Sequence, residues 1–226
     1  MRLVGFEAAT TSAGVVLADD DEVVGWRQVA PTRAHTEQLL PMVEALLDEA
    51  DWQLGTIEVV AVDVGPGLFT SLRVSGATAA GLALALGLQV VEVTSTEVLA
   101  EAAWARGARG GCVVAVDARR GELFVQRFTL DAEGVTAAAA PALWRPEQLA
   151  AAFEQEPGCG VGDGLVAAGL EDQALDPELL GAPPVAALAA VASRRASSAI
   201  DPAALRPRYL RPADARVNFE VREPPR

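Results

Sequence analysis

A short strand that runs into a glycine-rich turn and then into a helix constrains this chain more than any other stretch. The apolar run at residues 57–62 is too short and too β-branched for a helix, so it predicts a buried strand. The Gly-Pro-Gly sequence at 65–67 then turns the chain, because glycine permits positive φ and proline fixes its own. Thr70 or Ser71 is placed to cap a helix over about 72–86. This order predicts an α/β protein.

The same stretch is compatible with two kinds of role. A strand, a glycine turn and a helix N-terminus form a common anion or nucleotide site, because the free amides there point outward. The arrangement is also ordinary structure in α/β proteins that bind nothing at this place. The spacing alone leaves both open.

The amino-acid composition excludes several catalytic mechanisms. All 18 basic residues are arginine, and His35 is the single histidine. The chain therefore lacks a Walker lysine, a Schiff-base lysine and a histidine metal cluster, and any Ser-His-Asp triad would need His35. The net charge of −13 disfavours direct nucleic-acid binding over most of the surface. Cys112 and Cys159 are expected to be packed thiols of a reducing compartment.

An uncharged run raises the question of a membrane span. Residues 74–91 carry no charge, but they are mostly alanine and glycine with a turn at Gly87. We expect a buried helix followed by a strand. With no signal peptide recognised at the N-terminus, a soluble protein of the cytoplasm is expected, with no membrane partner.

The order of predicted elements suggests a duplication. Strands at 2–6, 13–18 and 23–29, a helix at 35–50, the strand–turn–helix unit, a strand at 89–93 and a helix from 94 or 95 to about 106 make a first unit. A strand at 113–116, an acidic turn and a strand at 122–130 then repeat its beginning. We predict lobes at 1–107 and 108–226. A helix at about 185–198 is expected to pack back on the first.

Three acids follow predicted strands: Glu7, Asp63 and Asp117. Such acids could gather around magnesium for phosphoryl transfer or nucleic-acid hydrolysis. They are also common turn formers and helix caps. The turn Thr10-Thr11-Ser12 after Glu7 resembles a weak phosphate loop.

Two helices offer a candidate association surface. The 35–50 helix carries an apolar stripe, and the 72–86 helix carries a face of small residues. Internal packing explains both stripes, and a two-helix patch used for association is the competing interpretation.

Six ordered motifs resemble the TsaB (YeaZ) family of bacterial tRNA threonylcarbamoyladenosine synthesis. They are Gly5-Phe6-Glu7-Ala8-Ala9-Thr10, the His35-led helix start through Pro41, the stretch from Gly65 to Arg73, Asp117-Ala118-Arg119-Arg120-Gly121-Glu122, Gly162-Asp163-Gly164, and Pro207-x-Tyr209-Leu210-Arg211. The chain departs from the family pattern at Glu7 for aspartate, Leu68 for a small residue and Ser71 for glycine. These changes should weaken any phosphate site.

The resemblance implies two ribonuclease-H-like lobes of the actin/Hsp70/sugar-kinase (ASKHA) type, with mixed sheets flanked by helices and a smaller second lobe. It also implies a non-catalytic partner of a TsaD-type transferase, joined by a TsaE-type ATPase, and homodimeric when alone. ATP and a metal would be used by the complex, tRNA would be reached only through it, and no cofactor, metal ligand or catalytic residue is expected on the isolated chain. The implied interface comprises His35, Leu39, Leu40, Val43, Leu46, Leu47, Leu72, Arg73, Gly76, Ala77, Ala80 and Leu84. A vestigial nucleotide site would comprise Glu7, Thr10, Thr11, Ser12, Asp63, Gly65, Gly67 and Asp117.

Two enzymatic alternatives remain. A magnesium- and nucleotide-dependent phosphotransferase or phosphatase of the same superfold would use Glu7, Asp63 and Asp117. A magnesium-dependent nuclease would use the same acids, against the repulsion between nucleic acid and an acidic body.

Overall fold

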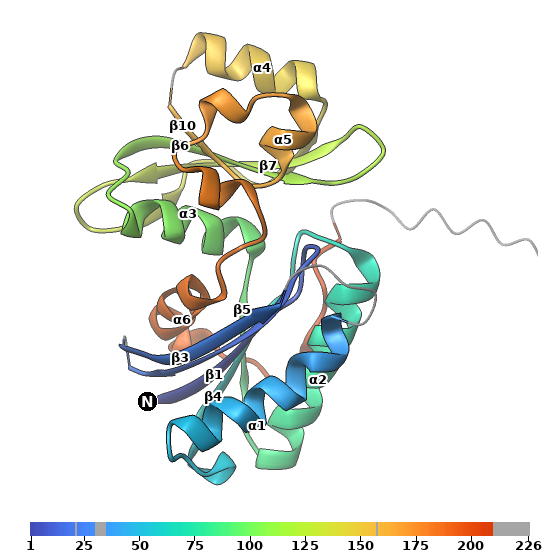
Figure 1. Ribbon diagram of the computed structural model, residues 1–226, viewed down its shortest axis with the longest axis vertical. Helices are drawn as coiled ribbons and strands as arrows, with labels where there is room; N and C mark the ends of the chain where they lie inside the picture. The colour runs from blue at the N-terminus through green and yellow to red at the C-terminus, as the bar shows by residue number, and fades with distance from the viewer. Residues whose placement is uncertain (21, 30–34, 157, 210–226) are drawn as a thin grey trace, which may run out of the picture.

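The chain forms two mixed β-sheets with helices around and between them (Figure 1). This computed structural model describes residues 1–20, 22–29, 35–156 and 158–209. The order of elements follows the predicted duplication: a five-stranded sheet comes first, and a second sheet follows from residue 110.

The first sheet has the order β3-β2-β1-β4-β5. Its strands are β1 (Arg2–Glu7), β2 (Ala13–Asp19), β3 (Glu22–Val29), β4 (Val59–Asp63) and β5 (Val90–Val93). The three strands predicted at the start of the chain, β1, β2 and β3, form an antiparallel meander. β4 pairs with β1 in parallel, and β5 pairs with β4 in parallel. Crossover helices supply the parallel connections.

Alternation along β1 assigns helices to the two faces of this sheet. Val4 and Phe6 point to the face covered by α1 (Leu39–Glu49) and α2 (Phe69–Leu86). Leu3 points to the other face, which α6 (Val185–Arg194) covers. Gly5 also lies on the α6 side, where a Cβ would come within 2.5 Å of a Leu188 methyl carbon, so glycine lets this helix approach the sheet closely.

The second sheet repeats the first in reduced form. Its strands are β6 (Gly110–Asp117), β7 (Leu123–Leu130), β8 (Val135–Ala137), β9 (Ala142–Trp144) and β10 (Cys159–Val161). β6 and β7 are antiparallel, β8 and β9 both pair with β7, and β10 joins β6 in parallel. β6, β7 and β10 correspond to β1, β2 and β4, and the two short strands β8 and β9 together take the place of β3. Both units therefore have the ribonuclease-H-like order, and the predicted ASKHA fold with a smaller second lobe is confirmed.

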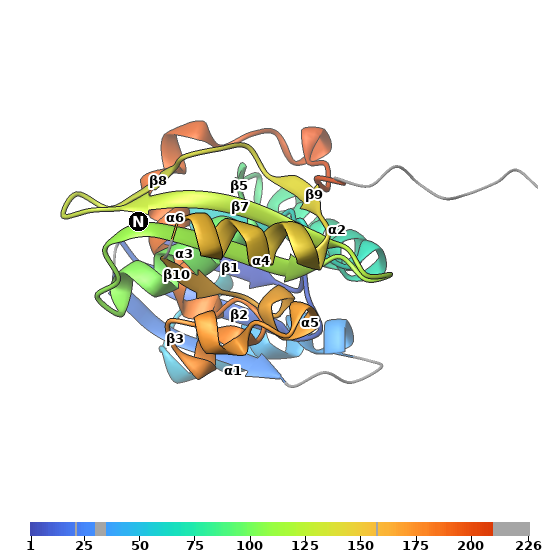
Figure 2. The same cartoon turned by 90° about the horizontal axis from the view of Figure 1, so that it is seen from above.

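Four helices complete the layers. α4 (Pro146–Gln155) and α5 (Gly164–Ala168) cover the outer face of the second sheet, while α3 (Ser95–Ala105) covers the inner face. α3 also packs against α6, so this helix pair fills the space between the two sheets (Figures 1 and 2). We propose to divide the chain after residue 107 and to assign α6 to the first lobe.

Two local predictions have different outcomes. Thr94 caps α3 in a capping box with Glu97, as expected for the helix opening at 94 or 95. The predicted cap of α2 is wrong, because the helix begins at Phe69 and places Thr70 and Ser71 in its first turn. Residue 68 is extended and its side chain cannot accept a hydrogen bond, so no side chain caps this helix.

By length and composition, α2 is the one helix of the described residues that could cross a membrane. It packs on β4 through Ala79 and Ala83, as a helix of a folded domain does. Its opposite side is largely exposed.

Candidate functional site

Two acids lie side by side at the ends of neighbouring strands. β1 and β4 pair in parallel, which brings Glu7 next to Asp63, and both side chains are fully buried. The Ala9 amide donates to Glu7 Oε1 at 2.9 Å, and the Gly65 amide donates to Asp63 Oδ1 at 2.7 Å. Each carboxyl group is thus fixed by the turn that follows its own strand.

Burial controls the protonation of this pair. It raises the pKa of Glu7 well above its usual range, and the neighbouring Asp63 adds to the effect. Burial also raises the pKa of Asp63 to about 7, against hydrogen bonds from the Gly65 amide and the Ser95 hydroxyl. Glu7 Oε2, Asp63 Oδ2 and Thr10 Oγ1 are buried without a hydrogen-bond partner. The folded chain therefore favours a protonated carboxyl group here.

The polar turn after β1 is covered by the glycine turn after β4. The Leu68 amide donates to the Ala9 carbonyl at 2.6 Å. A Cβ at Gly67 would come within 1.9 Å of the same oxygen, so only glycine allows this contact. Thr11 is half-buried, and Ser12 Oγ accepts from Gln28 Nε2 at 2.9 Å. The space between this turn and the second lobe has no room for a water molecule.

The third predicted acid does not join the buried pair. Both oxygens of Asp117 accept from Arg119, one from its amide at 2.7 Å and one from its guanidinium at 2.8 Å. The Asp117 amide donates to Asp163 Oδ1 at 2.8 Å, and burial raises the pKa of Asp163. Asp117 thus orders its own turn and the neighbouring strand end.

The residues present do not fit a magnesium–nucleotide group. Three unpartnered oxygens would suit a hard cation, but the turn at residues 10–12, which was expected to resemble a phosphate loop, is closed by Gly67 and Leu68 and contains no lysine. No group of three His, Cys, Asp or Glu side chains placed to hold a metal occurs in the described part of the chain.

The predicted helix patch needs correction. Five of its members are at most 6% exposed and belong to the chain's own core: Leu39, Val43, Leu46, Leu47 and Leu72. The first four face β2 because α1 buries its apolar stripe against the sheet. A partner could reach them only if the fold opened. Leu40 is 50% exposed, while the side chain of His35 lies outside the described part of the chain.

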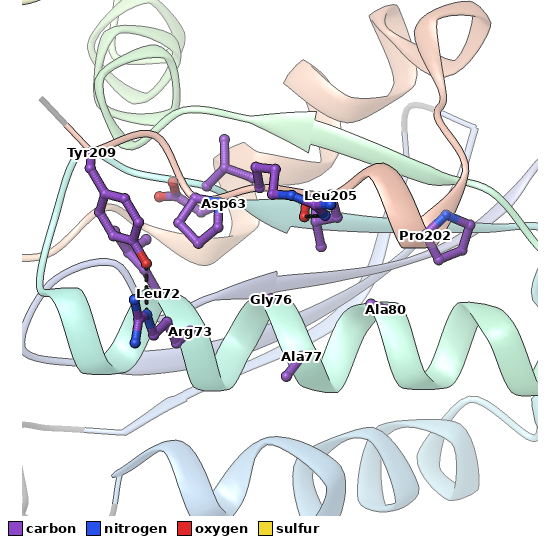
Figure 3. Close-up of a pocket in the computed structure, with 12 residues that line it drawn as sticks. Asp63, Leu72, Arg73, Gly76, Ala77, Ala80, Pro202, Leu205 and Tyr209 are labelled. Atoms are coloured by element: carbon purple, nitrogen blue, oxygen red, sulfur yellow. Dashed lines mark hydrogen bonds between the residues drawn. The ribbon is translucent and has the colours of Figure 1, made fainter. Parts of the chain in front are cut away.

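The chain's own C-terminal segment covers another part of the patch. A cavity of about 350 Å³ lies between α2 and residues 202–209, with Gly76 and Ala80 in its wall (Figure 3). Arg73 Nε donates to Tyr209 Oη at 3.0 Å, and the Arg73 guanidinium lies 3.8 Å from the Phe69 ring centroid. The Arg208 amide donates to the Val64 carbonyl at 2.8 Å. The segment is therefore held across the first turns of α2.

The outward face of α2 is apolar and largely exposed. Leu84, the most exposed of its large apolar side chains at 62%, lies on this face with Phe69 and Val74. Ala77, Gly81 and Ala85 lie between them, and Arg73 is the one charged residue of the helix. Since each of these positions lies within the same half of the helical wheel, they form one surface. We call Phe69, Val74, Ala77, Gly81, Leu84 and Ala85 the α2 face.

Several of these residues escaped the sequence analysis. Phe69 was missed because the helix was expected to begin at 72, and Val74 was missed because α2 is apolar on both sides. Tyr209 was noted only as part of the Pro207-x-Tyr209-Leu210-Arg211 motif. The sequence around Pro207 and Tyr209 gave no indication that Tyr209 would contact Arg73.

Comparisons with known proteins agree on one family. A protein-family model described as "TsaD: tRNA N6-adenosine threonylcarbamoyltransferase" matches residues 28–174. The tRNA threonylcarbamoyladenosine biosynthesis protein TsaB of Escherichia coli is 31% identical over 69% of this chain, and its Haemophilus influenzae counterpart is 30% identical over 55%. These alignments span 64% and 52% of the two relatives' lengths. The solved structure of YeaZ from Pseudomonas aeruginosa has a TM-score of 0.79 at 26% identity, covering 92% of this chain and 99% of that one.

Proposed function

Because this chain belongs to the TsaB (YeaZ) family, we propose that it acts in tRNA threonylcarbamoyladenosine biosynthesis, as a non-catalytic subunit that binds and activates a TsaD-type transferase. The relatives named TsaB and the TsaD family model support the pathway. We infer from the geometry of the chain that its partner is a TsaD-type protein and that this partner supplies the catalytic residues.

The observation that carries this proposal is the α2 face. A helix of 18 residues with one charged side chain leaves its apolar outward half exposed, which is typical of a protein-binding surface. Leu40 of the neighbouring helix α1 is a further exposed apolar side chain. Small residues at 77, 81 and 85 would allow a partner helix to approach closely.

The buried acids favour a supporting role over an enzymatic one. A phosphotransferase or nuclease would need its acids to converge at one open cleft. Here Asp117 is paired with Arg119, Glu7 is fully buried, and Asp63, also fully buried, lines the separate cavity next to α2 (Figure 3). We propose that ATP and a metal are used elsewhere in the complex, and that a TsaE-type ATPase joins it. The net charge of −13 supports tRNA contact through the complex rather than by this chain.

When no partner is present, a second copy would cover the α2 face. We propose that the isolated chain forms a homodimer, and that this homodimer dissociates and the complex forms when the partner is added. We propose that the chain carries out this role in the cytoplasm.

The test is complex formation with a purified TsaD-type protein, followed by light scattering. Leu84→Asp puts a charge on the α2 face, and we expect it to prevent both the homodimer and the complex. Val166→Asp is the matched control, since Val166 is 48% exposed on α5 of the other lobe. A Leu84→Asp chain that binds as well as wild type would overturn the assignment of the surface. A wild-type chain that does not bind would overturn the proposed role.

A further inference from the structure

The two cysteines of the chain lie side by side in the second sheet. β10 pairs with β6 in parallel, and Cys159 is the register partner of Cys112. Both side chains belong to the same apolar cluster on the α3 side of the sheet, with Leu99 and Ala103 of that helix. Both are free thiols, and they are the only cysteines in the sequence.

The spacing of paired strands places the two Cα atoms at a separation that a disulfide can span. Neighbouring strands lie about 4.8 Å apart, and disulfide-bonded residues have Cα atoms about 4.4–6.8 Å apart. Register partners in a parallel pair also point to the same face. β10 has only three residues and ends the strand order of its sheet, so a small shift of this strand can bring the two sulfur atoms together.

The two thiols have different environments. Cys112 is 1% exposed, whereas Cys159 is partly open to solvent. A hydrogen bond from the Cys112 thiol lowers the pKa of Cys159, while the same contact and burial raise the pKa of Cys112. Cys159 is therefore placed to react first and Cys112 to react second.

We propose that Cys112 and Cys159 form a peroxide-sensitive dithiol, which oxidises reversibly to a disulfide that ties β10 to β6. The Cys159 thiolate attacks one peroxide oxygen, the O–O bond breaks, and the departing hydroxide takes a proton to form water. The resulting sulfenic acid is attacked by the Cys112 sulfur. An S–S bond forms, the S–O bond breaks, and the Cys112 proton leaves with the hydroxide as a second water. Two thiols are oxidised and one peroxide is reduced.

The disulfide would act on the strand end that leads into the Asp163 turn. Asp163 accepts the Asp117 amide, so tying β10 to β6 would hold this strand end in place. It would also close a long loop of the unfolded chain, which raises the melting temperature of the oxidised protein.

The test uses the full-length, reduced chain under native conditions, treated with equimolar hydrogen peroxide. Remaining thiols are then alkylated in denaturant, and the chain is mapped by mass spectrometry. We expect both thiols to be lost together, a peptide linked through Cys112 and Cys159, and full recovery with dithiothreitol. The Cys112→Ser variant should stop at a sulfenic acid on Cys159 that dimedone traps. The Cys159→Ser variant should keep Cys112 reduced.

Three outcomes would overturn the proposal. One is a wild-type chain in which both thiols stay alkylatable after peroxide treatment. Another is a Cys159 that proceeds to sulfinic acid without any linked peptide. The third is a disulfide that forms only in denaturant, since the native strand register would then play no part.

Discussion

The carboxyl groups of Glu7 and Asp63 lie beside each other at the ends of two parallel strands, and each keeps one buried oxygen without a hydrogen-bond partner. In an active phosphotransferase such acids would face an open cleft. Here both side chains are fully buried, and a retained proton stabilises them better than a free charge.

The first prediction concerns the pH dependence of stability. Asp63 has a folded-state pKa of about 7, above its ordinary value of 3.8, so the folded chain binds more protons than the unfolded chain between these values. Its contribution to stability is fully present below about pH 4 and is lost as the pH rises towards 7. An Asp63→Asn variant cannot ionise here. It should gain stability over wild type as the pH rises across this window, by up to about 4 kcal/mol near pH 7, the equivalent of about three pKa units.

Urea unfolding at a series of pH values measures this difference. Asp48→Asn, on the exposed side of α1, is the control and should show no such trend. A difference between wild type and Asp63→Asn that stays constant from pH 4 to 7 would contradict the raised pKa.

The second prediction concerns the closed turn. Gly67→Ala places a Cβ against the Ala9 carbonyl, at 1.9 Å if nothing moves, and should destabilise the chain by about 3 kcal/mol. Gly81→Ala, on the exposed side of α2, meets nothing within 4 Å and should stabilise it by about 1 kcal/mol through helix propensity. Thermal unfolding compares the two. If the two variants have the same melting temperature, the turn can open to accommodate the Cβ at residue 67 without loss of stability, which would contradict this prediction.

The third prediction concerns the C-terminal segment. Tyr209→Ala removes both the hydrogen bond from Arg73 and the ring contact with Phe69, whose centroid lies 5.1 Å away. We expect the Arg208 amide, which donates to Val64, to exchange its hydrogen faster. Tyr209→Phe removes only the hydrogen bond and should show a smaller change. Exchange that is unaffected in both variants would show that Tyr209 does not hold the segment.

Much of this fold follows from sequence patterns because its main elements are long and regular. Alternating and β-branched runs identified all five strands of the first sheet, and Thr94 identified the start of α3. The strands β8 and β9 were missed, since three residues carry too little pattern to distinguish a strand from a loop. The α4 helix was missed within alanine-rich sequence.

The candidate surface was harder to predict for a physical reason. Periodicity reports that a helix has an apolar side, but it does not say whether that side meets the chain's own sheet or a partner. In α1 the stripe containing Leu39 and Leu46 meets the sheet. In α2 both sides are apolar, and only the structure shows that Ala83 is buried while Leu84 is exposed.

We propose that this chain supports tRNA modification without supplying catalytic residues. The most direct test is threonylcarbamoyladenosine formation on tRNA with purified TsaD-type and TsaE-type proteins and a threonylcarbamoyl-adenylate donor, with and without this chain. We predict that product forms only when the chain is present, that Asp63→Asn supports it at the wild-type level, and that Leu84→Asp does not. Full activity without the chain, or loss of activity in a folded Asp63→Asn variant that still assembles, would contradict the account.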